Sequence, residues 1–177
     1  GSIRSEVLNG VGYPFVNASQ YDMRWYVKRD SLLLKSKNGG KFEIFDPAYK
    51  YGGQLALTKE GIDGAGVLET PESLNRSRDF HFKQTKYNSK NAVFQVQSSD
   101  PENPAMFGDK IDVDFDLKDR LAYLNTTDVP GSHFSFPFTD YATDIDNVVW
   151  NLDQRKLLLS AKDDRLGTFA SLGEGKY

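Results

Sequence analysis

Hydrophobic and polar positions alternate along short stretches of this chain, and this is the pattern of strands that bury one face. Residues 110–117 alternate without a break, with aliphatic and aromatic side chains on one face and lysine or aspartate on the other. Shorter alternations occupy residues 41–45, 80–82, 92–97 and 134–138. These segments predict β-strands packed on a core by one face only.

Residues that favour turns separate the predicted strands at short intervals. Glycine, proline, asparagine and aspartate cluster at residues 38–40, 46–47, 52–53, 63–64, 100–101 and 130–131. A short helix fits residues 71–74, because Thr70 can cap it and Pro71 can take its first position. The pattern predicts an all-β fold of many short strands, a β-solenoid or a β-sandwich, with at most one short helix. Alternation fits both architectures.

An internal repeat is the most specific feature of the sequence. Trp25 and Trp150 each follow a Pro-Phe pair and each stand seven residues before a Leu-Leu-Leu triplet. The two copies are offset by 125 residues, from position 25 to position 150. Tryptophan and leucine at a fixed distance are residues that fill a core. The repeat therefore predicts two equivalent strand pairs whose tryptophans are buried.

The repeat also suggests a division of the chain. We expect residues 3–40 to end one repeat unit, residues 41–165 to form one full β-rich unit, and residues 166–177 to begin the next unit or form a tail. Residues 1–2, Gly-Ser, resemble a cloning scar. Repeat units of this kind stack and bury one another's faces, so the expected partners are neighbouring repeat units of the same chain.

Composition narrows the class of protein. Charged residues make up 27% of the chain and the formal net charge is only −3, so nothing in the charge balance indicates a nucleic-acid partner. Cysteine is absent, which removes disulfides and thiol catalysis. Apolar runs are far shorter than the roughly 20 residues that span a bilayer, so we expect no membrane insertion of this segment.

The densest acidic cluster lies within residues 109–119. Asp112, Asp114 and Asp116 alternate along a predicted strand, where a hard cation would relieve their repulsion, so Ca²⁺ is a candidate cofactor. The rest of a calcium loop is missing, since Leu117 stands where the motif needs glycine and Tyr123 where it needs glutamate. A solvated acidic strand face is the simpler interpretation.

Three tyrosines are candidate platforms for sugar rings. Tyr49 and Tyr51 lie between Pro47 and a Gly-Gly pair, which predicts an exposed loop, and Tyr87 is a third candidate. With polysaccharide as ligand and Ca²⁺ as a candidate cofactor, a carbohydrate-binding module is the second function hypothesis.

Evidence for catalysis is weak. Asp140, Asp144, Asp146 and Asp153 include enough carboxylates for a glycoside hydrolase, but sequence does not give their separation. The nucleophile motif Gly-x-Ser-x-Gly is absent, and neither histidine has a partner at metal-ligand spacing. Residues 61–66 lack a phosphate-loop pattern, so their glycines predict a turn or a close approach of strands. We therefore expect a non-enzymatic protein.

Residues 136–143, with 61–66 and 112–116, resemble segments of very large β-rich envelope or secreted proteins of Bacteroidota. The resemblance implies a repetitive β fold and an extracytoplasmic location: periplasm, cell surface or secreted. It carries no functional residues. The strand pattern also resembles periplasmic β-groove proteins that shelter lipid chains. The leading hypothesis is a non-enzymatic structural or interaction repeat module of a large extracytoplasmic protein, with carbohydrate binding and lipid sheltering as alternatives.

Overall fold

The computed structural model of the chain describes residues 1–139, 144–161 and 170–172, and most of these residues form β-strands. The all-β prediction is confirmed. The elements are β1 (Ser2–Ile3), β2 (Glu6–Leu8), β3 (Val11–Tyr13), β4 (Val16–Asn17), β5 (Tyr21–Tyr26), η1 (Val27–Arg29), β6 (Ser31–Ser36), β7 (Phe42–Ile44), β8 (Asp46–Thr58), β9 (Gly61–Glu69), β10 (Ser73–Phe82), β11 (Lys86–Val96), β12 (Met106–Asp116), β13 (Leu121–Asn125), β14 (His133–Ser135), β15 (Asn147–Asn151), β16 (Lys156–Ser160) and β17 (Ala170–Leu172).

Within the described ranges, the single 3-10 turn η1 is the only helical element, and no helix there is long and apolar enough to cross a membrane. The helix expected at residues 71–74 does not form. Thr70 instead closes a tight turn between β9 and β10, where its Oγ1 accepts the backbone N–H groups of Glu72 and Ser73. The same residue that caps helices therefore stabilises a turn here.

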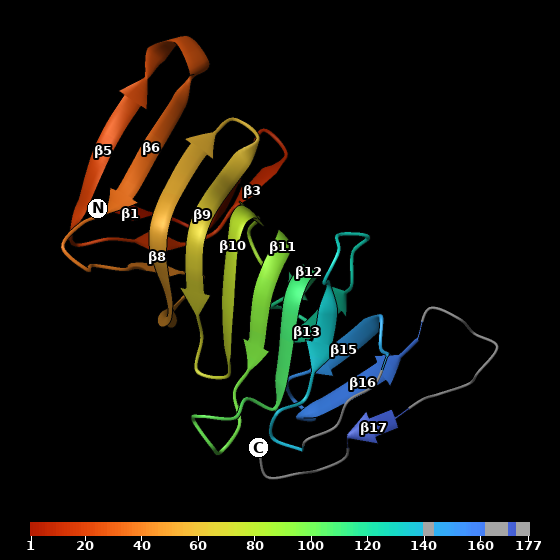
Figure 1. Cartoon of the computed structure of the whole chain (residues 1–177). Coiled ribbons are helices and arrows are strands. Elements are labelled where there is room, and N and C mark those ends of the chain that lie inside the picture. The colour runs from red at the N-terminus through yellow and green to blue at the C-terminus, as the bar shows by residue number, and fades with distance from the viewer. Residues whose placement is uncertain (140–143, 162–169, 173–177) are drawn as a thin grey trace.

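The strands form one large antiparallel sheet and one small hairpin, β2–β3. The main order is β1-β4-β7-β8-β9-β10-β11-β12-β13-β15-β16-β17, with the β5–β6 hairpin joined to β8 through β6, and β14 joined to β12. Figure 1 shows these strands side by side, from the β5–β6 hairpin at one end to β16 and β17 at the other. Since every described pairing in the main sheet is antiparallel, the parallel solenoid is excluded.

One face of the sheet is apolar along almost its full width. The cross-strand registers align two rows of side chains on this face. One row contains Met23, Leu34, Leu55, Gly64, Phe80, Ser89, Val113, Leu124, Val148 and Leu159. The other contains Trp25, Leu32, Leu57, Ile62, Phe82, Tyr87, Phe115, Ala122, Trp150 and Leu157. Cross-strand contacts of this kind are the unit of sheet stability.

The long central strands bend, so the sheet folds over on itself. In β10 the buried positions are Ser73, Asn75 and Ser77 before the bend and Phe80 and Phe82 after it, and the register shifts between them. Similar register shifts interrupt the pairing of β11 with β12. A bulge adds a residue, which lets a bent strand keep its apolar side inward on both sides of the bend.

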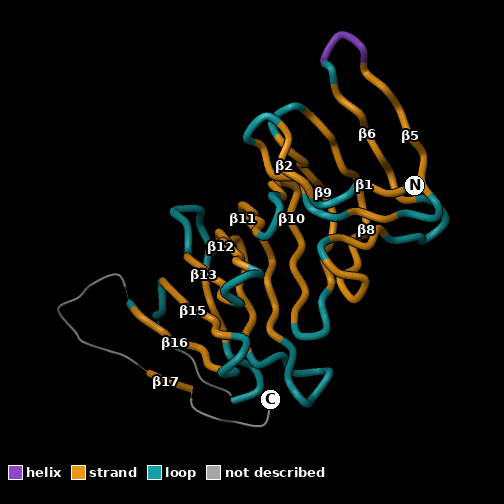
Figure 2. The backbone as a smooth tube through the Cα atoms, turned by 180° about the vertical axis from the view of Figure 1, so that it is seen from behind, coloured by secondary structure: helices purple, strands orange, loops and turns teal. Residues whose placement is uncertain are grey.

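Aromatic rings from the two halves of the folded sheet meet in the core. The ring of Tyr51 lies edge-on to Phe80 and Phe82, with centroids 5.7 and 5.3 Å away. Phe94 packs edge-on against Trp150 at 6.0 Å. Figure 2 shows the bent strands from behind. The fold is therefore a two-layered, sandwich-like arrangement made from one sheet.

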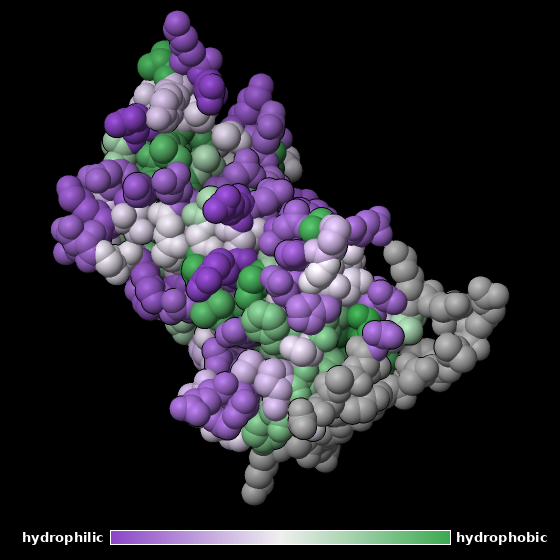
Figure 3. Space-filling model, viewed as in Figure 1, coloured by the Kyte–Doolittle hydropathy of each residue, from purple (hydrophilic) through white to green (hydrophobic). Residues whose placement is uncertain are grey.

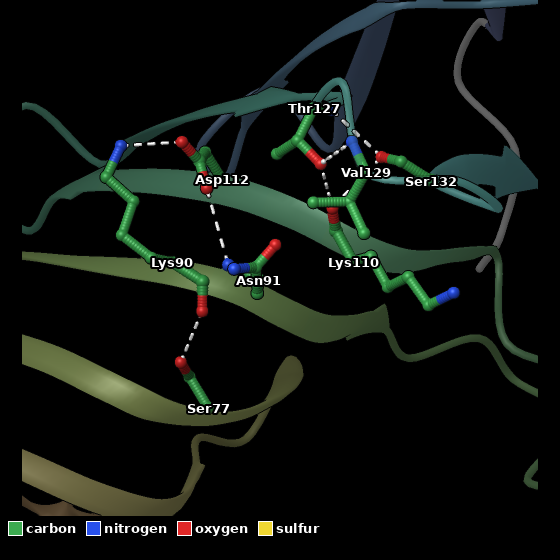
Figure 4. Close-up of polar contacts among 8 residues, drawn as sticks. All are labelled: Ser77, Lys90, Asn91, Lys110, Asp112, Thr127, Val129 and Ser132. Atoms are coloured by element: carbon green, nitrogen blue, oxygen red, sulfur yellow. Dashed lines mark hydrogen bonds and ion pairs between the residues drawn. The ribbon is translucent and has the colours of Figure 1, made fainter.

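Side chains hold the backbone at the bend, as Figure 4 shows. The Ser77 hydroxyl donates to the carbonyl of Lys90 at 2.6 Å, and the N–H of Asn91 donates to the Asp112 carboxylate at 3.3 Å. The Lys110 carbonyl accepts the hydroxyls of Thr127 and Ser132, each at 2.9 Å. These contacts satisfy backbone groups where a bulge interrupts the ladder.

Glycines permit β8 and β9 to approach closely at the same bend. Gly53 has a φ of +144°, and a β-carbon at Gly66 would collide with the carbonyl oxygen of Gly52. The predicted role of the glycines in residues 61–66 is therefore confirmed for a close approach of strands.

Candidate interaction surface

Both tryptophans of the sequence repeat lie in hairpins with the same local structure. Trp25 pairs with Leu32 between β5 and β6, and Trp150 pairs with Leu157 between β15 and β16. The loops 27–30 and 152–155 are closed in the same way, because the N–H of the last loop residue donates to the carbonyl of the first, at 3.3 and 3.2 Å. That last residue has a positive φ in both loops, 45° and 50°. Division of the chain into units of this period stays a prediction.

The two hairpins differ in what covers them. Trp150 is 4% exposed and meets Phe94 and Phe115 edge-on, and β15 pairs with β13 on its other side. Trp25 is 58% exposed, and β6 is the one strand paired with β5 among the described residues. The predicted burial is therefore confirmed for Trp150 and wrong for Trp25. Nothing in the local sequence distinguishes them, since the covering strands come from elsewhere in the fold.

We call the exposed side chains of β5, with Val27 at the hairpin tip, the β5 surface. Met23 is 64% exposed, Val27 79% and Tyr26 39%. Met23 and Trp25 continue the two apolar rows of the core face beyond β6. Figure 3 shows hydrophobic residues among hydrophilic ones over this end of the molecule. The apolar face of the sheet therefore extends out of the core and into solvent here.

The other face of β5 carries two opposite charges, Asp22 and Arg24. Asp22 Oδ1 lies 3.2 Å from Lys37 Nζ in an exposed ion pair. Arg24 makes no ion pair with any residue in the described part of the chain. As an edge strand, β5 also directs alternate backbone N–H and C=O groups away from β6, towards solvent. The β5 surface thus combines an apolar side, a charged side and an open backbone edge.

The candidate sugar platforms lie in the core or at its margin. Residues 47–53 belong to β8, so the expected exposed loop is wrong: Pro47 stands near the start of a strand and Gly52-Gly53 lie at its bend. Tyr51 and Tyr87 are 0% and 2% exposed, and burial raises the pKa of both hydroxyls, so neither ring offers a face to a sugar. Tyr49 is half-buried, and burial raises the pKa of its hydroxyl as well.

The candidate calcium ligands lie on the outer face of β12 beside lysines of β11. Asp112 and Asp116 each accept a lysine ammonium at 2.6 Å, from Lys90 and Lys86 respectively. The hydrogen bond from Lys86 lowers the pKa of Asp116. Asp114 is exposed between them. The two lysines therefore provide the positive charge that relieves the repulsion among the aspartates, which is the role predicted for Ca²⁺. No three acidic or histidine side chains gather into a cation site in the ranges that the structure describes.

Among the aspartates considered for a glycoside hydrolase, Asp146 and Asp153 have different partners. Asp153 holds Arg120 Nε at 2.5 Å, whereas Asp146 accepts the Thr126 hydroxyl at 3.0 Å. Asp144 is exposed, and Asp140 lies outside the described residues. Sequence reasoning missed Arg120. Its guanidinium also lies 3.9 Å from Glu72, at the rim of a cavity of about 390 Å³ that Trp150 and Leu152 help to line.

Comparison with known proteins adds no relative: no protein-family model, no curated protein and no solved structure matches this chain. The fold and its exposed hairpin define the class, an all-β protein built on one folded antiparallel sheet in which β5 is paired on one side only among the described residues.

Proposed function

We propose that this chain is a non-enzymatic structural and interaction module of a larger extracytoplasmic protein, and that it joins its sheet to another β-rich unit at the β5 surface. One observation carries the proposal. Two hairpins share register and turn, yet only the second has its tryptophan covered and its outer strand paired. The β5–β6 hairpin is the same structure without its cover.

The β5 surface has the properties of an interface. Edge strands of soluble proteins are usually shielded by bulges, prolines, charged side chains, short length or a covering segment, and of these β5 has two charges, Asp22 and Arg24. β5 has six residues with no proline, and its pairing with β6 has no register shift. An exposed aromatic and apolar side chain beside open backbone groups fits the addition of a strand from a partner.

The covered hairpin shows which chemistry such a partner needs. β13 places the small residue Ala122 opposite Trp150 and Leu124 opposite Val148, and Phe94 and Phe115 cover the indole. A partner for β5 is therefore an antiparallel strand carried by an aromatic-rich β unit. Such a strand could come from a neighbouring repeat unit in a longer chain or from a separate molecule.

A fusion tests the proposal directly. A second copy of residues 86–125, which contain β11, β12 and β13, is fused directly before Gly1. The added strands then precede Trp25 by the same number of residues as the original strands precede Trp150. In a Trp150→Phe background, where Trp25 is the remaining tryptophan, we expect the fusion to shift Trp25 emission to the blue and reduce its quenching by acrylamide. A matched fusion with Ala122→Arg in the added copy should leave Trp25 exposed. Equal quenching of Trp25 with and without the added copy, in a chain that also stays monomeric, would refute the proposal.

Carbohydrate binding is the second candidate, and it now depends on Tyr49. This ring lines an open pocket with Phe45, Asp46, Glu72 and Arg120, a mixture of apolar and charged groups. Affinity electrophoresis through soluble polysaccharides, with Ca²⁺ and with chelator, tests it. Retardation that Tyr49→Ala abolishes would support it, and unchanged mobility in every gel would remove it.

Lipid sheltering has less support. It needs an open apolar cleft between the two halves of the sheet, and that space is filled by buried rings, among them Phe80, Phe82 and Tyr87.

A further inference from the structure

We propose that the β5 surface binds a second copy of this chain, with the β5 strands of the two copies paired antiparallel about a two-fold axis. The inference rests on the proposed function, because it names the partner of the same surface. It is carried by the self-complementarity of β5, since residues 21–25 of this strand match their own reversed order in one register.

That register is centred on Met23. It places Met23 opposite the second copy's Met23, and Tyr21 opposite the second copy's Trp25. Both contacts lie on the apolar side of the strand, since Tyr21, Met23 and Trp25 share that side with the core rows. The apolar face then runs without interruption from one sheet into the other. Aromatic pairs directly opposite each other stabilise an antiparallel ladder.

The charges select the same register. With Met23 at the centre, Asp22 lies opposite the second copy's Arg24, so two ion pairs form on the polar side. A register centred on Arg24 would set two arginines opposite each other, and one centred on Asp22 would set two aspartates opposite each other. Like charges directly opposite destabilise strand pairing. In a register shifted by one residue, Met23 lies opposite Arg24 or Asp22. Apolar residues then lie opposite charged ones, and the apolar face is interrupted.

The ion pairs that β5 already makes permit this arrangement. The contact from Asp22 to Lys37 uses Oδ1 at 3.2 Å, which leaves Oδ2 for the incoming guanidinium. Arg24 has no competing ion pair among the described residues. The interface is isologous, so it closes at two copies instead of growing into a fibre. It also fills the open backbone edge of both strands at once.

Sedimentation velocity of the whole chain, from about 2 to about 200 µM, is the first experiment. A paired strand of this length makes a small interface, so we expect reversible dimers with a dissociation constant of roughly 1–100 µM. Arg24→Asp should weaken the dimer at least tenfold, because it sets Asp22 opposite aspartate. The double variant with Asp22→Arg and Arg24→Asp should restore it, because the charges exchange places. Arg78→Asp, the same charge change on the exposed part of β10, should leave the dimer intact.

A cross-link fixes the register independently of the charges. The chain has no cysteine, so Met23→Cys introduces a single thiol at the two-fold axis. Directly paired strand positions have the spacing that a disulfide needs. We expect mild oxidation to give covalent dimers with Met23→Cys and not with Val129→Cys, which is exposed on a distant loop.

The outcomes separate the two proposals. A chain that stays monomeric throughout, or dimers that Arg24→Asp does not weaken, would overturn the inference. If the monomer persists while the fused copy of residues 86–125 covers Trp25, the partner is a different β unit and the proposed function stands. If neither partner covers Trp25, both proposals fail.

Discussion

At the scale of single residues, the two tryptophans isolate the effect of surroundings from that of local sequence. Each stands at the same place in the same kind of hairpin, opposite the first leucine of a triplet. Only Trp150 has aromatic neighbours, Phe94 and Phe115. The buried Trp150 should therefore contribute more than Trp25 to the free energy of unfolding. A large side chain stabilises a fold through its packing contacts and through the apolar area that it removes from water.

We expect Trp150→Ala to lower the free energy of unfolding by about 3–5 kcal/mol, because it leaves a cavity among buried rings. Trp25→Ala, the matched control, should cost less than about 1 kcal/mol at protein concentrations where the chain is monomeric. Urea unfolding followed by circular dichroism measures both. If both variants lost the same free energy of unfolding, Trp25 would have to be buried in the monomer, and its exposed position would be contradicted.

The glycines at the bend give a second residue-scale prediction. Gly66→Ala should destabilise the fold by roughly 1–3 kcal/mol, since its β-carbon would collide with the Gly52 carbonyl. Gly52→Ala is the control, because the nearest atom to a β-carbon there is Lys41 Cγ at 3.9 Å. Thermal melts of both variants test this. A Gly52→Ala protein as unstable as Gly66→Ala would contradict the steric explanation.

At the scale of elements, the sequence predicts strands better than it predicts how they bend. Alternation in residues 110–117 is confirmed by the burial of Ile111, Val113 and Phe115. A bulge changes which positions face the core, as in β10, and the hydrophobic pattern of the sequence does not predict where a bulge lies. The prediction of an exposed loop at Tyr51 is wrong for a related reason: proline and glycine near a strand bend have the same sequence pattern as those in a loop. Local sequence therefore predicts which residues form strands, whereas the burial of a side chain depends on strands that are distant in the sequence.

The lysine–aspartate pairs between β11 and β12 predict a pH dependence. The pKa of Asp116 is lowered in the fold, so its stabilising effect is present above the unfolded-state value near 4 and is lost as pH falls through the folded-state value. We expect Asp116→Asn to cost about 0.5–1 kcal/mol at pH 7 and progressively less below pH 4.

Urea midpoints at pH 7, 5 and 3 check this difference. Asp114→Asn is the control, because this exposed carboxylate makes no hydrogen bond or ion pair among the described residues. A cost for Asp116→Asn that stays constant across this range would mean that shape, and not charge, matters at this position.

At the scale of the whole molecule, the two hairpins occupy different places in the sheet. β15 has strand partners on both sides, β13 and β16, whereas β5 is paired on one side only in the described part of the chain. Protection of backbone amides follows such differences, since paired and buried groups open less often.

Hydrogen exchange should therefore distinguish the hairpins. At low micromolar concentration we expect the outward amides of β5 to exchange within seconds, and the amides of β15 to be protected by orders of magnitude. Mass spectrometry of peptides covering each hairpin measures this. Strong protection of β5 in dilute protein would mean that a segment of the same molecule covers it.

The order of strands in the sheet also affects how fast the chain folds. From β8 to β13, each strand pairs with the next one in sequence, so the loops that must close are short. Proteins dominated by such local pairing fold faster than other all-β proteins of the same size. A central hairpin can therefore nucleate the sheet, which then grows outwards by one strand at a time. Trp150 meets Phe94 and Phe115 only after β15 has docked, so its fluorescence would report a late step of folding.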